Sequence, residues 1–216
     1  KCDGDPLHPQ RRGAVLELFD RLSHATLQKG KATVPSKLEK EQILFYIESG
    51  AGVVEAGGKR AELHAGVGIF MPAGLTFTIT NTGEESLAMY LIVEPMTPGF
   101  APIEDMIVKD ENTIPIGGTK GHWSHIVRSF FYGEETKNLM TTLSGMCPVW
   151  FEPMTLGQPH SHKPGDEEVW FLVEGEAVIL LGKELRRLTP GMAYKIPPDY
   201  TTPHSNINVS THDAKF

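Results

Sequence analysis

Short β-branched and aromatic runs, separated by Gly and Pro, recur along most of this 216-residue chain and favour an all-β fold. Alternation over so few residues suits strands better than helices, which need longer periodic stretches. The runs occupy residues 42–48, 52–55, 68–71, 76–80 and 87–93, and then 124–131, 146–151, 168–173, 177–181, 192–196 and 206–209.

The two series of runs resemble each other. The strand, Gly turn and strand of Ile47–Val53 correspond to Leu172–Val178, and the Gly-turn-Pro segment Gly66–Pro72 corresponds to Gly191–Pro197. A repeat at a spacing of about 125 residues indicates a duplicated β unit rather than a solenoid. Residues 96–121 are rich in Pro, Gly and Asp, so we place a linker there.

Residues 12–22 form the one stretch with convincing helical periodicity. Val15, Leu18, Phe19 and Leu22 fall at i, i+3, i+4 and i+7, although Leu16, Leu18 and Phe19 also suit a buried strand. We therefore expect a short N-terminal helix or strand extension.

Composition and charge exclude several classes of protein. The formal net charge of −7 opposes a nucleic-acid partner. The most apolar stretch, residues 65–79, is broken by Gly and Pro and is too short to cross a membrane. Cys2 and Cys147 are too few for a disulfide framework. The chain begins at Lys1 rather than Met, so we expect that an upstream segment was removed or lies outside this sequence; the compartment stays open, with the cytoplasm slightly favoured.

The second half contains a cluster of metal-ligand residue types. His160 and His162 are spaced i and i+2, so on a strand both imidazoles point to one face. A carboxylate from Glu167 or Glu168 adds a third ligand, and His204 adds a fourth. Imidazoles with a carboxylate suit one divalent transition metal ion, whether Fe, Mn, Zn, Ni, Cu or Co, and leave positions open for a substrate. The alternative is that these residues come together by chance.

These residues resemble the two motifs of the cupin superfamily. Gly157–Gly175 resembles the first motif, a His-x-His pair followed by Glu, six residues and Gly, and Gly191–Asn208 resembles the second. The resemblance implies a bicupin: two jelly-roll (double-stranded β-helix) barrels over residues 24–95 and 122–212, with a metal site in the C-terminal barrel only.

The sequence departs from the first motif at two points. Its opening Gly is three residues before His160 rather than six, and five residues separate His162 from Glu168 instead of three or four. Counting back from Gly175 selects Glu168 over Glu167, because strand pairing fixes the register whereas the loop after His162 can absorb an insertion.

The N-terminal half has the strand skeleton without the ligands. Residues 33–36 stand where the His pair should fall, and Phe77 stands in place of the last His. We expect no metal there, and a structural role, an oligomerisation surface or a metal-free pocket lined by Phe45, Met71 and Phe77.

Other residues carry weaker signals. His122 and His125 have a helical spacing that does not suit the strand expected there, and Cys147 lies in an apolar run typical of an inert buried thiol. Four further residues flank the proposed ligands, where we expect them either to shape a cavity or to pack in the core: Gln158, Trp170, Met192 and Tyr194.

The resemblance implies a small-molecule metalloenzyme that is dioxygenase-like, or an isomerase or lyase. The catalytic residues stay unknown, and we expect a small-molecule substrate or ligand and a homodimer. The alternative is a non-catalytic protein that uses the metal to bind a small ligand, or a structural cupin, because the fold alone does not decide function.

Overall fold

The computed structural model describes residues 16, 21–117 and 125–216. These residues are almost entirely strand and loop, which confirms the all-β fold class. Helical turns within them are limited to two 3₁₀ segments, η1 (Glu111–Thr113) and η2 (Gly133–Asn138). No helix in the described ranges has the length and apolarity needed to span a membrane.

The chain divides into two compact units. The first comprises residues up to 114 together with 130–145, and the second comprises 115–129 and 146–216. Strand β8 (Ile107–Asp110) lies within the segment predicted as a linker and pairs with β5 of the first unit. The barrel boundaries read from the sequence, 24–95 and 122–212, stay a prediction.

The helix considered for residues 12–22 falls mostly outside the described residues. Its last two residues, Arg21 and Leu22, are extended and begin strand β1. They pair with Val93 and Ile92, so this part of the segment follows the alternative, a strand extension.

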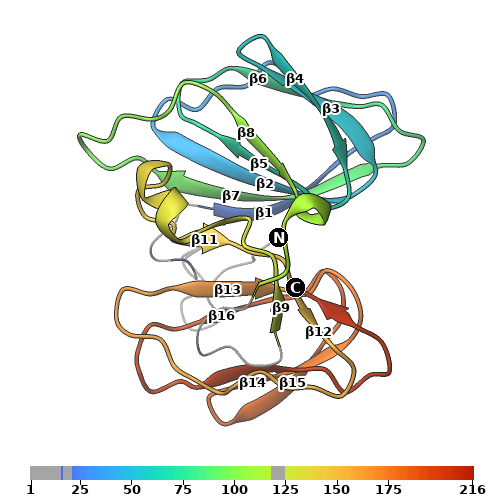
Figure 1. Ribbon diagram of the computed structural model, residues 1–216, viewed down its shortest axis with the longest axis vertical. Helices are drawn as coiled ribbons and strands as arrows, with labels where there is room; N and C mark the ends of the chain where they lie inside the picture. Colours follow the sequence, from blue (N-terminus) through green and yellow to red (C-terminus); the bar gives the residue numbers. More distant parts are fainter. Residues whose placement is uncertain (1–15, 17–20, 118–124) are drawn as a thin grey trace, which may run out of the picture. The chain divides into compact units, whose positions relative to one another are not determined.

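Two antiparallel sheets build the first unit (Figure 1). Their orders are β1-β7-β2-β5-β8 and β4-β3-β6. The strands other than β8 are β1 (Arg21–Leu27), β2 (Glu41–Ser49), β3 (Ala51–Ala56), β4 (Lys59–His64), β5 (Val67–Met71), β6 (Phe77–Asn81) and β7 (Leu87–Pro95).

Alternate residues of these strands form the first core, because successive side chains on a strand point to opposite faces. On β2, Ile43, Phe45 and Ile47 belong to this core. The opposite face of the sheet is covered by residues 130–145. Phe130 lies so close to Gly68 that a Cβ there would come within 2.0 Å of its ring, so only Gly allows this packing.

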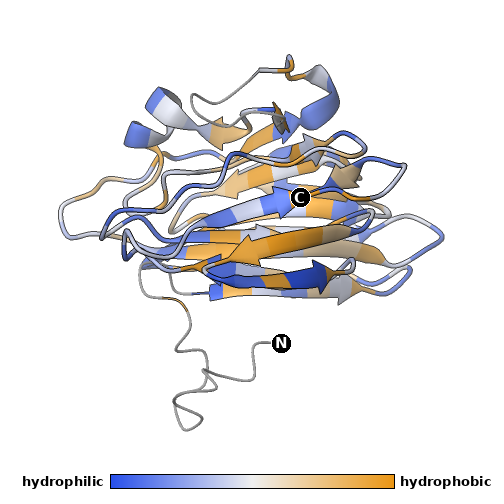
Figure 2. Ribbon diagram, turned by 90° about the horizontal axis from the view of Figure 1, so that it is seen from below, coloured by the Kyte–Doolittle hydropathy of each residue, from blue (hydrophilic) through white to orange (hydrophobic). Residues whose placement is uncertain are grey.

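The second unit consists of three small antiparallel sheets with the orders β18-β12-β9, β13-β16 and β15-β14-β17. Hydrophobic residues concentrate along its strands as along those of the first unit (Figure 2). The strands of this unit are β9 (His125–Val127), β12 (Val149–Phe151), β13 (Glu168–Phe171), β14 (Ala177–Leu181), β15 (Glu184–Leu188), β16 (Ala193–Ile196), β17 (His204–Ile207) and β18 (Ala214–Lys215). The short strands β10 (Phe131–Tyr132) and β11 (Gly145–Met146) form a separate pair and, except for Met146, belong to the first unit.

Candidate metal centre

Three histidine side chains converge within the second unit. The ligand atoms of His160, His162 and His204 all lie within 4.8 Å of one another. Their ring centroids are 4.3 Å apart for His160 and His204, and 5.1 Å apart for each of the other two pairs. Among the described residues, these three form the group of His, Cys, Asp and Glu side chains that is able to hold a metal ion.

Backbone hydrogen bonds fix two of these histidines against each other. His160 N donates to His204 O at 3.2 Å, and His204 N donates to His160 O at 2.9 Å. His160 therefore forms an isolated antiparallel bridge to the first residue of β17 rather than a strand of its own. The carbonyl of His162 accepts a hydrogen bond from Tyr200 N at 2.8 Å, which ties the second histidine to the loop before β17.

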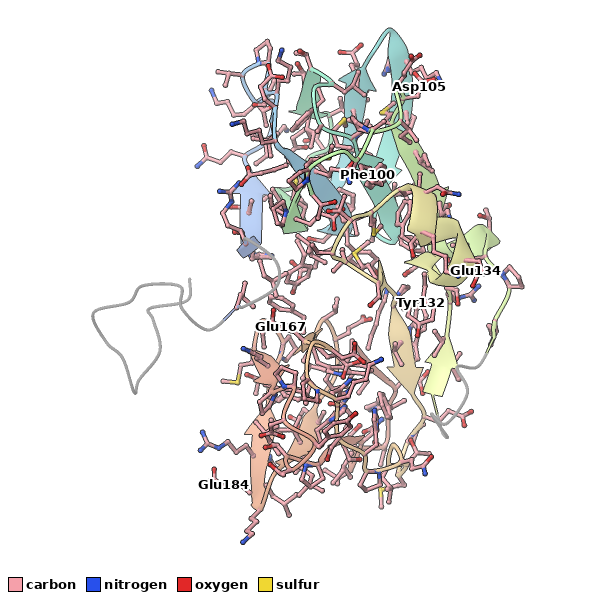
Figure 3. All side chains as sticks on the ribbon, turned by 90° about the vertical axis from the view of Figure 1, so that its left-hand side faces the viewer. Phe100, Asp105, Tyr132, Glu134, Glu167 and Glu184 are labelled. Atoms are coloured by element: carbon pink, nitrogen blue, oxygen red, sulfur yellow. The ribbon has the colours of Figure 1, made fainter. Side chains whose placement is uncertain are left out.

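The two adjacent carboxylates point to different partners. Oε2 of Glu168, the first residue of β13, lies 3.2 Å from Nε2 of His162 and 3.1 Å from Nε2 of His204. Glu167, which is labelled in Figure 3, instead pairs with Lys195, with 2.9 Å between Oε1 and Nζ. Because the strand register places these side chains on opposite faces, Glu168 is the one that faces the imidazoles.

The electrostatics of the cluster follow from these contacts. Burial acts to raise the pKa of Glu168, but the facing His162 and His204 imidazoles outweigh it and hold this pKa well below its ordinary value. The Glu168 carboxylate in turn raises the pKa of His162, against the opposing effect of burial. A carboxylate that stays ionised among imidazoles is the charge arrangement that a divalent cation requires.

The donor set fits a divalent transition metal. Nδ1 of His160 lies 3.0 Å from the carbonyl oxygen of Gln158, and since a carbonyl only accepts, Nδ1 carries the proton and Nε2 keeps its lone pair for a metal. Nε2 of His162 and Oε2 of Glu168 are buried and approach each other without the geometry of a hydrogen bond. Buried polar atoms that face each other without a hydrogen bond are typical of a site that binds an ion.

The next layer of the second unit holds a polar pair. Tyr194 pairs with Trp170 across β16 and β13, and its hydroxyl donates to Oδ1 of Asn206 at 2.8 Å. Burial raises the pKa of Tyr194, and the charge of Glu168 raises it further. Sequence analysis singled out Trp170 and Tyr194 but missed Asn206. The sequence signal that could have identified Asn206 is its position two residues after His204, which places both side chains on one face of a strand.

The first unit repeats this backbone arrangement with different side chains. Ser36 and Phe77 form the same isolated antiparallel bridge as His160 and His204. Phe77 thus occupies the position of the last histidine, as the sequence predicted.

The carboxylate position of the first unit is also apolar. Ile43 pairs with Met71 as Glu168 pairs with Ile196 in the second unit. Phe45, Met71 and Phe77, considered as the lining of a pocket, all belong to the packed first core.

The remaining candidates lie away from the cluster or outside the described residues. His122 and Cys2 are not described, and His125 begins β9. Cys147 packs against the second core, which agrees with an inert thiol. Met192 is 48% exposed, so it is not a core residue.

Comparisons with known proteins support the same architecture. The family model described as "Cupin domain" matches residues 23–93 and 149–216, more than half of the chain. No curated protein matches the chain.

Several solved structures have a similar fold at low sequence identity. AerE from Microcystis aeruginosa is 14% identical with a TM-score of 0.67, over 90% of this chain and 83% of that one. Vicilin from hazelnut, Corylus avellana, is 13% identical with a TM-score of 0.68, over 90% and 72%. A variant of oxalate decarboxylase from Bacillus subtilis is 12% identical with a TM-score of 0.62, over 90% and 67%. These similarities confirm two tandem jelly-roll barrels.

Proposed function

The chain belongs to the cupin family as a bicupin, and from this premise we propose that its second barrel binds one divalent transition metal and acts on a small molecule. The proposed ligands are His160, His162, Glu168 and His204. The observation that carries the proposal is the convergence of the three imidazoles within 4.8 Å, with the Glu168 carboxylate 3.1–3.2 Å from two of them.

A metal bound by this set would supply Lewis-acid chemistry toward an oxygen-bearing ligand, or would present that ligand to O₂. The chain itself contributes orientation and charge. The Gln158 carbonyl holds His160 in the tautomer that leaves Nε2 available. The backbone bridge between His160 and His204 keeps their imidazoles next to each other. The ionised Glu168 would offset part of the cation's charge.

The decisive experiment is elemental analysis of protein purified without a His tag or added metal, with the metal counted per chain. About one metal ion per chain is expected, and a chain that stays metal-free after reconstitution would rule out the ligand set. Oxygen consumption that requires Fe would support a dioxygenase. Anaerobic turnover with several divalent ions would support an isomerase or lyase.

One observation favours the alternative of a non-catalytic binding protein. Two ionisable groups near the proposed ligands that a catalyst would use as a base are engaged elsewhere: Glu167 pairs with Lys195, and the Tyr194 hydroxyl donates a hydrogen bond to Asn206. A bound ligand recovered chemically unchanged after prolonged incubation with the metal-loaded protein would support this alternative over an enzyme.

A homodimer also stays part of the proposal. Strand β1 is one edge of the five-stranded sheet in the first unit, and exposed edges are commonly covered by pairing. Light scattering coupled to size-exclusion chromatography should give twice the mass of the 216-residue chain. A monomer at micromolar concentration would contradict this.

A further inference from the structure

We propose that Asn206 recognises the ligand of the second barrel by donating a hydrogen bond from its amide Nδ2 to an oxygen atom of a small carboxylate that carries a second oxygen function. Tyr194 is the residue that positions this amide. The inference rests on the proposed metal-binding function and adds a substrate class to it.

Asn206 is placed close to the histidine cluster. It lies on β17 two residues after His204, so both side chains point to the same face of the strand, roughly 6.6 Å apart along it. Asn206 is 2% exposed and pairs with Ile179 of β14, which belongs to the second core. A small ligand attached at the histidine cluster would have this amide within reach.

The Asn206 side chain makes a hydrogen bond through its oxygen and none through its nitrogen. Oδ1 accepts the Tyr194 hydroxyl proton at 2.8 Å, which orients the amide and turns Nδ2 away from Tyr194. Within residues 21–117 and 125–216, Nδ2 makes no hydrogen bond, and it is not one of the fully buried polar atoms that lack a partner. The donor therefore keeps some exposure and is open to an acceptor oxygen of a ligand.

The internal repeat places apolar residues at the positions of Tyr194 and Asn206. In the first unit Ile69 stands at the position of Tyr194, because it pairs with Phe45 as Tyr194 pairs with Trp170. Ile79 stands at the position of Asn206, two residues after Phe77.

Both isoleucines are buried in the first core. The fold thus accommodates an apolar pair in this layer. Since burying polar groups opposes folding unless they are fully paired, the polar pair is explained by a role next to the histidine cluster.

The chemistry of Nδ2 defines the class of ligand. An amide N–H donates only, so it recognises a carboxylate, keto or hydroxyl oxygen rather than an ammonium group. A ligand that binds the metal through a carboxylate and accepts a hydrogen bond from Asn206 through a second oxygen would use both the metal and the amide. Oxalate, malonate and pyruvate meet this description, and acetate lacks the second oxygen function.

The test is to load the full chain with Co²⁺, count cobalt per chain, and titrate oxalate, malonate, pyruvate and acetate by their effect on the cobalt absorption spectrum. The double variant Asn206→Leu/Tyr194→Phe imitates the apolar pair of the first unit, so no buried polar group is left unpaired. Tyr194→Phe alone tests positioning. Ile179→Val, which changes the neighbour of Asn206 without touching a polar atom, is the matched control.

We expect at least one of the three larger anions to bind the wild type about tenfold or more tightly than acetate, since a hydrogen bond to a charged group is worth that much. The double variant should keep its cobalt and lose about tenfold of this preference, while the part that comes from chelation of cobalt by two oxygens stays, with acetate affinity changed less than about twofold. Tyr194→Phe should lose part of the preference, and Ile179→Val none of it.

Failure of the inference and failure of the proposed function give different results. Wild-type protein that takes up no cobalt overturns the metal site and this inference with it. Cobalt binding without any preference over acetate, or with a preference that is undiminished in the double variant, overturns the role of Asn206 and leaves the metal site standing.

Discussion

His160 and His204 hold each other through two reciprocal backbone hydrogen bonds, of 3.2 and 2.9 Å. Ser36 and Phe77 form the same reciprocal pair in the first unit, with both distances 2.9 Å. The bridge therefore belongs to the fold and does not depend on the imidazoles. The two barrels differ in the side chains that this shared backbone presents, so we expect substitutions to separate the proposed metal binding from folding.

The His204→Ala variant should lose metal while keeping its fold. The substitution removes one of three converging imidazoles and leaves the backbone bridge intact, so affinity should fall roughly tenfold or more. Elemental analysis after dialysis and far-UV circular dichroism measure the two properties. His64→Ala is the control, because this exposed histidine pairs with Asp110 in the first unit. Equal metal content in His204→Ala and wild type would contradict the assignment.

The Phe77→Ala variant should show the opposite pattern. Phe77 is 6% exposed and its ring packs edge-on against Phe45 at 5.6 Å, so truncation should lower the free energy of unfolding by about 3–5 kcal/mol. Metal content per chain should stay at the wild-type value. Urea unfolding measures the stability, with Val34→Ala, at a 78% exposed position, as the control expected within about 0.5 kcal/mol. Loss of metal in Phe77→Ala would contradict the separation of the two barrels.

Much of the fold was readable from the sequence because its central strands are buried and rich in β-branched and aromatic residues. Strand β14 was predicted with its observed bounds, Ala177–Leu181, and β2 differs from the predicted range by one residue at each end. The histidine cluster was readable for a related reason. The i, i+2 spacing and the Gly and Pro positions of the repeat are local features that fix where side chains point.

The rest depended on contacts that no local pattern encodes. Strands β4 and β15 were missed because they are mostly exposed and rich in Lys, Arg and Glu, which hides the alternation. The packing of residues 130–145 on the first unit depends on Phe130 fitting over Gly68, a pairing distant in sequence. Asn206 was missed because a single buried amide carries no signal until its neighbours are known.

The two barrels close their last turn with equivalent asparagines. Nδ2 of Asn208 donates to the carbonyls of Phe151 and His212 at 2.9 and 2.7 Å. Nδ2 of Asn81 donates to the carbonyls of Leu27 and Glu85, both at 2.8 Å. Replacement of either by Ala removes the donor from two carbonyls, in bonds that are buried for Phe151 and partly buried for the other three.

Asn208→Ala and Asn81→Ala should therefore each lower the free energy of unfolding by about 1–3 kcal/mol. Urea denaturation measures the loss, and Asn112→Ala, at an exposed position, is the control. A change under about 0.5 kcal/mol in both variants would show that water replaces these hydrogen bonds.

A buried carboxylate holds the segment that covers the first sheet. Glu94 is 3% exposed and accepts hydrogen bonds from the backbone nitrogens of Thr141, Thr142 and Leu143 at 2.8–3.3 Å, and from Gln42 Nε2 at 2.8 Å. In Glu94→Ala these donors lose their acceptor, so residues 139–143 should open more readily.

Amide hydrogen exchange measures this opening. We expect faster exchange at residues 139–143 in Glu94→Ala and unchanged exchange on β14 of the second unit. Glu104→Ala, at an exposed position, is the control. Wild-type protection of residues 139–143 in Glu94→Ala would show that Phe130 and its neighbours hold the segment without the carboxylate.

Stability of the metal-free protein should depend on pH through His162 and Glu168. The pKa of His162 is raised above 6.5, so its stabilising effect is complete below that value and is lost as the pH rises through the raised pKa. The pKa of Glu168 is lowered below 4.5, so its effect is complete above that value and is lost as the pH falls through the lowered pKa. Together they stabilise the metal-free protein most between these two values.

Metal competes with the proton on His162, so metal binding should strengthen as the pH rises through the raised pKa of this imidazole. The gain in melting temperature on adding Zn²⁺ should therefore be small near pH 5 and large near pH 8. Differential scanning fluorimetry across this range measures the gain. Glu168→Gln removes the charge that raises the pKa of His162, so the rise in the gain should begin at lower pH and reach a smaller plateau. A gain that is the same at both ends of the range would mean that no histidine of the cluster loses a proton when the metal binds.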